Sequence, residues 1–411
     1  MIPYGRQDIT QVDIDSVVEV LRSDFLTQGP LVPRFEQSVA KYCGAQHGIA
    51  VNSATSALHI ACLALGVGSG DWVWTSPNTF VASANCALYC GAKIDFVDID
   101  PQTYNISVER LREKLEQAER TGRLPKVVIP VHYAGQPCDM PAIYSLGQRY
   151  GFKIIEDASH AIGASYVIPR SAGVGGSPHV ASGAKATVRL FDEIKVGSCQ
   201  HSHITVFSFH PVKIITTGEG GMATTNDVSL ANTMGRLRTH GITTDKALMH
   251  PRPNNEIWNY QQIELGFNYR MTDMQAALGL SQFLRLNEFI GRRRQIAGYY
   301  DEKLRDLPIT TPWQATGTHS SYHLYPIRIR EKLSQKTQGQ VYAALMASGI
   351  AANLHYIPVH RHPFYENLGF KRGHCFEAEQ FHEEVVSLPI YPTLSGEQQE
   401  NVIRSLAKSF E

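Results

Sequence analysis

The sequence of 411 residues is poor in charge. Lysine and arginine number 38, aspartate and glutamate also number 38, and charged residues are 18% of the chain. Disordered chains and coiled coils carry a much larger share of charge, so this composition excludes both classes. A formal net charge of zero provides no basic field that would attract nucleic acid. Hydrophobic residues, at 43%, suffice for a sizeable core in two or three domains, or in one large domain with a smaller one attached.

Long hydrophobic runs and a disulfide framework are also lacking. No stretch approaches the roughly 20 apolar residues of a membrane-spanning helix. The opening MIPYGRQDITQVDIDSV has neither the basic nor the apolar region of a signal peptide. Seven scattered cysteines, an odd number, fit reduced and mostly buried thiols. We therefore expect a soluble, cytoplasmic protein.

Short apolar strands alternate with helices in the first half of the chain. Two helices are expected first, over residues 8–23 and from Pro33 to about Gly44. Strands are then expected at 48–51, 71–75, 93–97, 126–131 and 152–155, with helices between them and at 140–150. This alternation predicts βαβ units and a mainly parallel sheet. Continuous apolar runs such as KVVIPV indicate that helices cover both faces of that sheet.

The pattern changes in the last quarter of the chain. Strands at 204–209 and 222–224 and helices at 273–287 and 288–307 complete the first part. Then follow a strand at 322–329, a helix at 334–349, a strand into His355 and helices near 377–385 and 396–409. We predict a large α/β domain over residues 1–300, with a helical segment at 1–45, and a small α+β domain over 301–411.

Residues 166–200 interrupt the alternation. They are rich in Gly, Ser and Ala and show no clear period, so we predict an irregular surface insertion with no assigned role. Cys199, His201 and His203 alternate at its end. Metal binding is one interpretation, but alternation at the entry to a strand favours packing, and we predict no metal site.

Lys213 is the first candidate for chemistry. It stands in FSFHPVKIITTGEGG, after an apolar strand and before a glycine-rich turn. Burial lowers the pKa of a lysine and makes its amine a nucleophile able to form a Schiff base. An exposed loop lysine is the alternative.

Asp157 and His160 form the second candidate, in IIEDASHAIG. Asp157 follows a buried strand, where parallel sheets bind ligands, and is placed to hold the protonated nitrogen of a pyridine ring such as that of pyridoxal phosphate. His160, about one helical turn further on, is placed to hydrogen-bond the phenolic oxygen of that ring. A helix N-cap is the alternative for Asp157, and a core position is the alternative for His160.

Two further segments favour the same cofactor. The turn NSATSAL, with Ala54, Thr55 and Ser56, combines small and hydroxyl residues before a helix, which is typical of an anion site for a phosphate. Simple N-capping is the alternative. Phe80 follows a strand end and is placed to stack on a flat heterocycle, with a core position as the alternative.

These segments resemble the DegT-type sugar-nucleotide aminotransferases, a pyridoxal-phosphate family of the fold-type I architecture. The resemblance covers nearly the whole chain, through LTQGPLVPRFE, NSATSAL, EDASHAIGA, FSFHPVK, TTGEGGM, ELGFNYRMTDMQAALGLSQ, HLYP and LHYIPVH. It implies a large domain with a mainly parallel seven-stranded sheet, a small C-terminal α+β domain, and a homodimer that shares its active sites.

The resemblance also implies a role for each matching residue. Lys213 matches the Schiff-base lysine and Asp157 the partner of the ring nitrogen, and both are the catalytic candidates. The remaining cofactor contacts would be Ala54, Thr55, Ser56, Phe80, His160, Ser208, Asn268 and Arg270. In the family the asparagine at the position of Asn268 reaches the phosphate from the other subunit. Substrate contacts would come from Thr27, Gly29, His355 and Tyr356.

The implied reaction is the amination of C4 of a UDP-linked 4-keto-6-deoxy-N-acetylhexosamine, with glutamate as donor, in pseudaminic-acid-type biosynthesis. Another 4-keto or 3-keto nucleotide sugar remains an alternative, as does a different pyridoxal-phosphate reaction such as aldol cleavage. Relatives that remove a hydroxyl carry histidine in place of the lysine, so Lys213 argues against that activity. A non-catalytic sugar-nucleotide sensor would not need the lysine and aspartate together.

Overall fold

A seven-stranded sheet organises most of the chain. The computed structural model describes residues 1–169, 191–251, 253 and 259–411. In spatial order the strands are β2 (His47–Val51), β10 (Gly221–Thr225), β9 (Ile204–Ser208), β6 (Lys153–Asp157), β5 (Val127–Ile129), β3 (Trp72–Thr75) and β4 (Lys93–Phe96). Strand β10 is antiparallel to both neighbours, and the pairs from β9 to β4 are parallel. The prediction of a mainly parallel seven-stranded sheet is confirmed.

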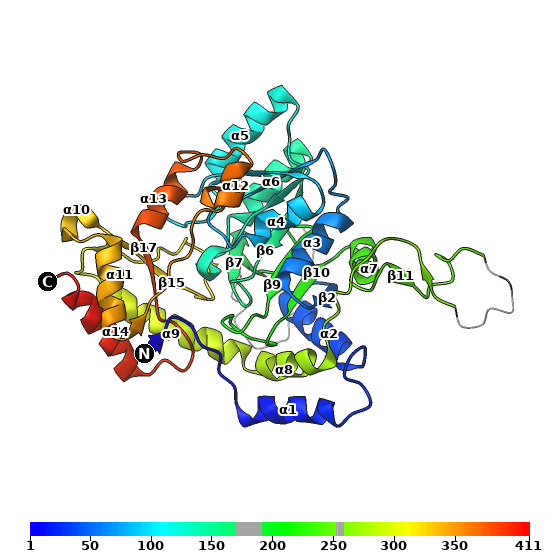
Figure 1. Ribbon diagram of the computed structural model, residues 1–411, viewed down its shortest axis with the longest axis horizontal. Helices are drawn as coiled ribbons and strands as arrows, with labels where there is room; N and C mark the ends of the chain where they lie inside the picture. Colours follow the sequence, from blue (N-terminus) through cyan, green and yellow to red (C-terminus); the bar gives the residue numbers. More distant parts are fainter. Residues whose placement is uncertain (170–190, 252, 254–258) are drawn as a thin grey trace, which may run out of the picture.

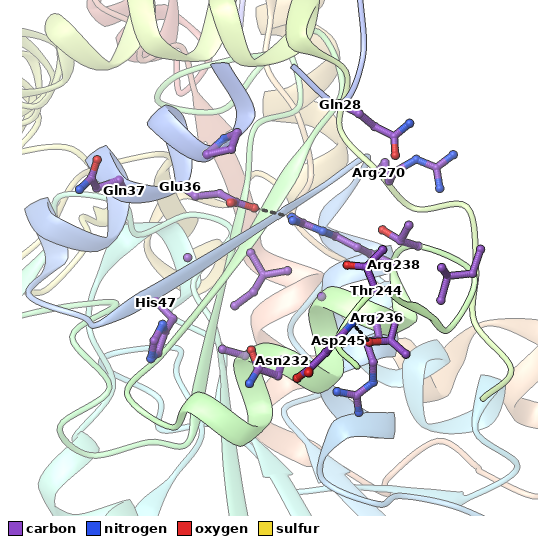
Figure 2. Close-up of a pocket in the computed structure, with 18 of the residues that line it drawn as sticks. Gln28, Glu36, Gln37, His47, Asn232, Arg236, Arg238, Thr244, Asp245 and Arg270 are labelled. Carbon is purple, nitrogen blue, oxygen red and sulfur yellow. Dashed lines mark hydrogen bonds and ion pairs between the residues drawn. The ribbon is translucent and has the colours of Figure 1, made fainter. Parts of the chain in front are cut away.

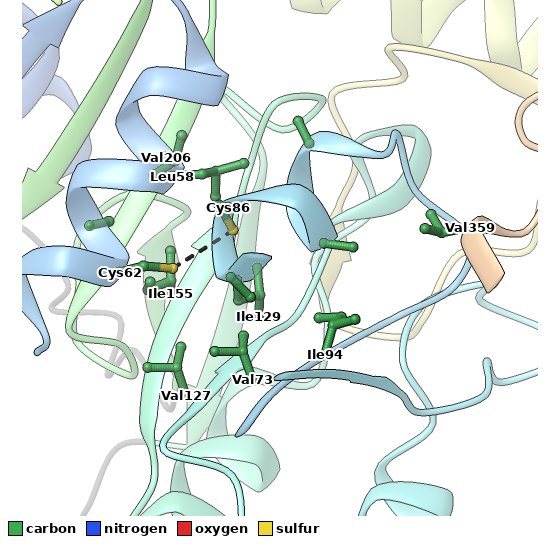
Figure 3. Packing of buried hydrophobic residues seen from close by; sticks show 14 of the residues in the cluster. Leu58, Cys62, Val73, Cys86, Ile94, Val127, Ile129, Ile155, Val206 and Val359 are labelled. Atoms are coloured by element: carbon green, nitrogen blue, oxygen red, sulfur yellow. Dashed lines mark hydrogen bonds between the residues drawn. The ribbon is translucent and has the colours of Figure 1, made fainter. Parts of the chain in front are cut away.

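Helices cover both faces of this sheet. Successive residues of β5 face opposite sides, so Val127 and Ile129 join one buried cluster and Val128 joins another. The first face carries α3 (Ala54–Ala64), α4 (Ala82–Tyr89) and α7 (Val228–Leu237). The second carries α5 (Val108–Thr121) and α6 (Met140–Tyr150), and, over β9 and β10, α2 (Leu31–Cys43) and α8 (Asp273–Leu284). Figure 3 shows Leu58 and Cys62 of α3 and Cys86 of α4 packed over the strands of the first face. Helix α7 was not predicted from the sequence.

The C-terminal part builds a second core. Strands β13 (Ile309–Thr310), β15 (Tyr325–Ile329) and β17 (Val385–Leu388) form an antiparallel sheet. It packs with α9 (Leu286–Lys303), α11 (Gln338–Ala347) and α14 (Gly396–Lys408), and these C-terminal elements lie on the left in Figure 1. Strand β1 (Ile2–Pro3) pairs with β16 (Ile350–Ala351), so the first residues of the chain join this core too. The boundary at residue 300 stays a prediction, and it falls within α9.

The flanks of the predicted irregular insertion are ordered strands. Strands β7 (Ser165–Pro169) and β8 (Phe191–Lys195) pair antiparallel, and β14 (Thr318–His319) extends them to a three-stranded sheet. The expectation of irregular structure is therefore wrong at both flanks, while residues 170–190 lie outside the described residues. Each flank is too short to show a period, and its partner strand is distant in sequence.

The remaining elements lie around these cores. They are α1 (Gln11–Leu21), β11 (Ile242–Thr243), β12 (Gln261–Gln262), α10 (Glu331–Ser334), α12 (Pro363–Asn367), α13 (Phe376–Glu384) and the 3₁₀ turns Tyr133–Gly135 and Val359–Arg361. Helix α1 is held against α8 by Asp13, which is 0% exposed and pairs with Arg285. Across the described ranges, no helix combines the length and the apolar character that a membrane span requires.

Candidate active site

The candidate site lies where β6 and β9 end. These strands are parallel neighbours, with Asp157 paired to Val206, and the carboxyl ends of parallel strands form the ligand-binding edge of a sheet. Asp157 is the last residue of β6 and Ser208 the last of β9, and Lys213 lies in the turn that follows. Residues far apart in the sequence therefore meet at one edge.

Asp157 is 5% exposed and accepts two hydrogen bonds. Its Oδ2 accepts from the hydroxyl of Ser83, at 2.5 Å, and its Oδ1 accepts from the backbone N–H of Ser159, at 3.1 Å. A turn rather than a helix follows Asp157, so the N-cap alternative is wrong. Ser83 was missed in the sequence, where a hydroxyl among the small apolar residues of α4 was the available sign of its role.

Lys213 carries an amine that titrates near neutrality. Burial lowers the pKa of Lys213 to about 8, and the negative charge of Asp157 opposes part of that decrease. A substantial neutral fraction is therefore present at physiological pH, as a nucleophilic or proton-transferring amine requires. The exposed-loop alternative does not fit this environment.

His160 is a buried neutral donor next to Lys213. Its Nδ1 accepts the backbone N–H of Ala134 at 3.3 Å, so the ring proton lies on Nε2, which is 3.0 Å from the hydroxyl of Tyr356. Burial, with the charges of Lys213 and His355, holds the pKa of His160 well below its ordinary value. His160 can thus donate a proton from Nε2 in a hydrogen bond without carrying charge.

His355 and Tyr356, two of the four predicted substrate residues, lie close to Lys213 and His160. Nδ1 of His355 lies 2.9 Å from the Ser387 hydroxyl, and burial, followed by the charge of Lys213, lowers the pKa of His355 to about 3. Burial raises the pKa of Tyr356. Both side chains are therefore neutral near pH 7.

His323, in the HLYP motif, was not identified from the sequence as a site residue. Its ring centroid lies 4.3 Å from that of His160, and its Nδ1 has no hydrogen-bond partner in the described part of the chain. Burial, with the charges of His160 and Lys213, lowers its pKa well below the ordinary value. A buried ring nitrogen without a partner, next to His160 and Lys213, marks His323 as part of the candidate site.

The N-terminus of α3 is the candidate anion site. Ser53 caps the helix by accepting the N–H of Ser56, at 3.1 Å, while the N–H groups of Ala54 and Thr55 have no acceptor among the described residues. The backbone of Gly221 lies directly beside this turn. A Cβ at this position would lie only 2.5 Å from the backbone nitrogen of Ala54.

Gly221 also joins the anion site to the end of β9, since it pairs with Ser208. Two free N–H groups and the Ser208 hydroxyl thus lie at one edge and suit a phosphate. The Ser56 hydroxyl donates to Asn52 Oδ1 at 2.7 Å, so in this conformation it supports the turn itself.

Phe80 is 59% exposed, so the core alternative for this residue is wrong. It lies two residues before the start of α4, and its carbonyl accepts the N–H of Ser83 at 3.2 Å. Its ring is therefore available to stack on a planar ligand.

Four further predicted residues make other contacts within the chain. Asn268 is exposed, and its carbonyl accepts from the side chain of Asn52 beside the anion site. Thr27 forms a bridge with Thr272, and Gly29 donates its N–H to Asp273 at 2.6 Å. Arg270 lines a cavity whose lining does not include Lys213 or Asp157. Their predicted cofactor and substrate contacts stay predictions.

This cavity has a volume of about 1410 Å³ and is rich in arginine. Figure 2 shows Arg270 near Gln28, with Arg238 paired to Glu36 at its centre. The Arg238–Glu36 pair is partly buried, and its charges therefore largely satisfy each other.

The candidate metal ligands have separate partners. His201 Nδ1 lies 2.8 Å from the Tyr166 hydroxyl, and His203 Nδ1 accepts the N–H of Ile154 at 3.2 Å. Within the described ranges, no three His, Cys, Asp or Glu side chains are grouped to hold a metal ion.

The residues at the β6–β9 edge fit pyridoxal 5′-phosphate. The α3 N-terminus suits its phosphate, the buried carboxylate of Asp157 suits a protonated ring nitrogen, and Lys213 offers an amine of lowered pKa for covalent attachment.

Comparisons with known proteins agree with this chemistry. The chain is 33% identical to the UDP-4-amino-4,6-dideoxy-N-acetyl-beta-L-altrosamine transaminase of Campylobacter jejuni, over 96% of this chain and 94% of that protein. It is 38% identical to the GDP-perosamine synthase of Caulobacter vibrioides, over 86% of this chain and 84% of that protein.

Solved structures share the fold over the whole chain. Helicobacter pylori PseC, an aminotransferase involved in the biosynthesis of pseudoaminic acid, superposes with a TM-score of 0.83 at 28% identity, covering 100% of this chain and 99% of that one. The putative sugar aminotransferase Spr1654 of Streptococcus pneumoniae, with a TM-score of 0.82 at 27% identity, covers 100% of this chain and 98% of its own in its PLP form, and a PMP form is also known.

The family model for DegT/DnrJ/EryC1/StrS aminotransferases matches residues 7–407. This match, the relatives above and the chemistry of the site lead to one assignment. The chain belongs to the DegT/DnrJ/EryC1/StrS aminotransferase family and is a pyridoxal-phosphate-dependent sugar aminotransferase.

Proposed function

We propose that this enzyme transfers an amino group from glutamate to C4 of a UDP-linked 4-keto-6-deoxy-N-acetylhexosamine. We expect the reaction in the cytoplasm, in the biosynthesis of a pseudaminic-acid-type sugar for a cell-surface glycan. The names of the Campylobacter and Helicobacter relatives support this substrate. The observation that carries the reaction type is the meeting of Lys213 and Asp157 at the ends of adjacent parallel strands.

A second candidate is the amination of another 4-keto or 3-keto nucleotide sugar. The 38% identity to GDP-perosamine synthase favours it, because that relative is named for a GDP-linked sugar. A non-catalytic sensor of the same fold is the third candidate, and the amine of lowered pKa in Lys213 argues against it.

The chain's own residues supply binding, orientation and proton transfer. When bound, pyridoxal phosphate supplies an electron sink for the carbanion formed at the substrate carbon. The N–H groups of Ala54 and Thr55 bind the phosphate, and the carboxylate of Asp157 holds a proton on the ring nitrogen. Nζ of Lys213, with its pKa near 8, accepts and returns a proton at the substrate carbon. The Nε2–H of His160 can donate a hydrogen bond while the ring stays neutral.

The proposed homodimer would complete the site. The backbone of Asn268 is tied to Asn52 next to the anion site, while its side chain is exposed. A second copy facing this surface would bring Asn268, and Arg270 nearby, to the phosphate of the first. Mixed dimers of Lys213→Ala and Asn268→Ala subunits should therefore regain part of the activity that each variant lacks alone. Verified mixed dimers without activity would contradict the shared site.

The substrate is tested by product mass. The enzyme is incubated with glutamate and a panel of UDP-, dTDP- and GDP-linked 4-keto sugars. We expect an amino sugar from the UDP-linked N-acetylhexosamine at the highest kcat/KM. A higher kcat/KM with a GDP- or dTDP-linked sugar would establish the second candidate, and no amination of any sugar together with tight binding would favour the sensor.

Covalent attachment of the cofactor is tested by borohydride reduction and protein mass. Lys213→Ala should lose the attached cofactor and lower turnover at least about 10³-fold, because the chain then lacks both nucleophile and proton carrier. Lys303→Ala, an exposed lysine beside Glu302, is the matched control and should retain both. Attachment that persists in Lys213→Ala would overturn the assignment of this lysine.

A further inference from the structure

Two buried hydroxyl groups lie behind Asp157. Ser83, in the first turn of α4, is 0% exposed, and Thr79, one turn earlier, is 3% exposed. The Ser83 Oγ lies 2.5 Å from Asp157 Oδ2 and 2.7 Å from Thr79 Oγ1. The three side chains therefore form one continuous hydrogen-bonded row that ends on the carboxylate.

The direction of these hydrogen bonds follows from the acceptor at the end of the row. An ionised carboxylate can only accept, so the single hydroxyl proton of Ser83 points to Asp157. Because that proton is then committed, the hydroxyl of Thr79 must donate to Ser83. Each hydrogen bond of this row polarises the next one. The bond from Ser83 to Asp157 is the stronger of the two, because its acceptor is charged.

The surroundings of Ser83 show that packing alone does not require a hydroxyl there. Its helical neighbours Ala82, Ala84 and Ala87 are buried and apolar, so alanine would fit the same space. A buried hydroxyl destabilises the fold unless it is hydrogen-bonded. Its bond to Asp157 thus accounts for serine at this position.

We propose that the Thr79–Ser83 pair is a hydroxyl relay that keeps Asp157 ionised and so holds the shared proton on the cofactor's ring nitrogen. Hydrogen bonds donated to a carboxylate favour its charged form. With Ser83 on Oδ2 and the Ser159 N–H on Oδ1, the carboxylate competes less well for the proton between it and the ring nitrogen. Ser83 and Thr79 are positioning residues, because they act on the cofactor through Asp157.

The other groups that face Asp157 do not replace this relay. Lys213 and Tyr356 are the titratable side chains whose charges interact with it, and neither makes a side-chain hydrogen bond to it in the described part of the chain. Glu156, the preceding residue, is bonded to His132 and to Ser202 instead. Among the described residues, Ser83 is therefore the side chain that hydrogen-bonds this carboxylate directly. The inference rests on the cofactor and is independent of which sugar is aminated.

The relay is tested by the nitrogen-15 chemical shift of ring-labelled cofactor bound to the dimer. In Ser83→Ala the shift should move toward that of a neutral pyridine. The kcat should fall roughly ten- to a hundredfold, the range set by one hydrogen bond to a charged group. The KM for glutamate should change less than about twofold, because the lost interaction acts on the chemical step. Thr79→Val should shift the resonance in the same direction by a smaller amount.

Two further variants separate the relay from a structural role. Ser83→Thr keeps the hydroxyl and should restore both the shift and kcat. Ser281→Ala is the matched control, because Ser281 is also buried and donates to a buried carboxylate, Asp13 Oδ1, at 2.6 Å on the far side of α8. It should leave the shift and kcat unchanged. A wild-type nitrogen shift in Ser83→Ala, with or without loss of activity, would overturn the proposal.

Discussion

Two adjacent carboxylates of β6 are held in opposite ways. Glu156 is 3% exposed and Asp157 is 5% exposed. Glu156 accepts from three side chains: Oε2 lies 2.7 Å from His132 Nε2, and Oε1 accepts from the hydroxyls of Ser202 and Thr205. Asp157 accepts from one side chain and one backbone N–H, and it is the one beside Lys213.

This difference indicates that β6 carries one carboxylate with a structural role, Glu156, next to one that is suited to a ligand, Asp157. Successive side chains of a strand point to opposite faces, so one residue step separates the two environments. The donors to Glu156 come from β9, from the residues just before β9 and from the segment after β5, so this network ties these segments to β6. Asp157 accepts only one hydrogen bond on each oxygen within the described residues and so retains acceptor capacity. A buried carboxylate with spare acceptor capacity beside an amine of lowered pKa is the one suited to a ligand.

The largest expected effect is the loss of turnover when the charge of Asp157 is removed. Asp157→Asn keeps the shape of the side chain but cannot hold a positive ring nitrogen. We expect kcat to fall about 10²- to 10³-fold, the scale of losing one preorganised electrostatic contact. The melting temperature should change little, because the amide oxygen can still accept the Ser159 N–H, while the Ser83 hydroxyl can turn to accept from the amide N–H₂ and donate to the Phe80 carbonyl. Steady-state kinetics and thermal melting measure both, and near-normal turnover would break the comparison.

For Glu156, on the other face of β6, we expect a smaller effect, on stability rather than on turnover. Glu156→Gln places an amide N–H₂ where the network contains only donors, so one buried donor loses its acceptor. We expect the free energy of unfolding to fall by about 1–3 kcal/mol, with kcat of the folded enzyme nearly unchanged. Denaturant titration and kinetics check this. Glu109→Gln, on the exposed surface of α5, is the control and should change neither.

The acid dependence of this stability has a definite sign. Burial by itself would raise the pKa of Glu156, but the hydrogen bonds from His132, Ser202 and Thr205 outweigh it and the pKa is lowered. A lowered folded-state pKa stabilises the protein above the ordinary glutamate value of about 4.3 and loses that contribution below it. The stability gap between wild type and Glu156→Gln should therefore narrow as the pH falls below about 4. A gap that widens in acid would contradict the assigned network.

The local sequence pattern predicted the site residues that lie at the end of a strand or shortly after it. Lys213, Asp157 and His160 each follow a buried strand closely, and the sheet brings those strand ends together. Helix α6 was also predicted with its observed bounds, because Pro141 near its start and Gly151 after its end mark both limits.

Contacts between distant segments were beyond the same reasoning. Ser83 meets Asp157 across 74 residues, and no local period indicates such a contact. His323 reaches His160 from the C-terminal part. Strands β7 and β8 are recognisable only as a pair, and residues 170–190 separate them in the sequence. The antiparallel direction of β10 was open to prediction, because the connection from Ser208 to Gly221 is too short for a crossover helix.

The smallest expected effect sharpens the comparison through Lys213. The cofactor attaches to the neutral amine, and burial lowers the pKa of Lys213 to about 8. The attachment rate of cofactor-free enzyme should therefore rise with pH and level off above about 8. Because the charge of Asp157 raises this pKa, Asp157→Asn should move the midpoint of that rise to lower pH, by about one pH unit. Glu156→Gln removes an equal charge one residue away, but on the face directed away from Lys213, so its midpoint should match that of the wild type. Rapid-mixing absorbance after addition of pyridoxal phosphate measures all three. Equal shifts in the two variants would show that Lys213 senses the net charge of the strand rather than the one carboxylate that faces it.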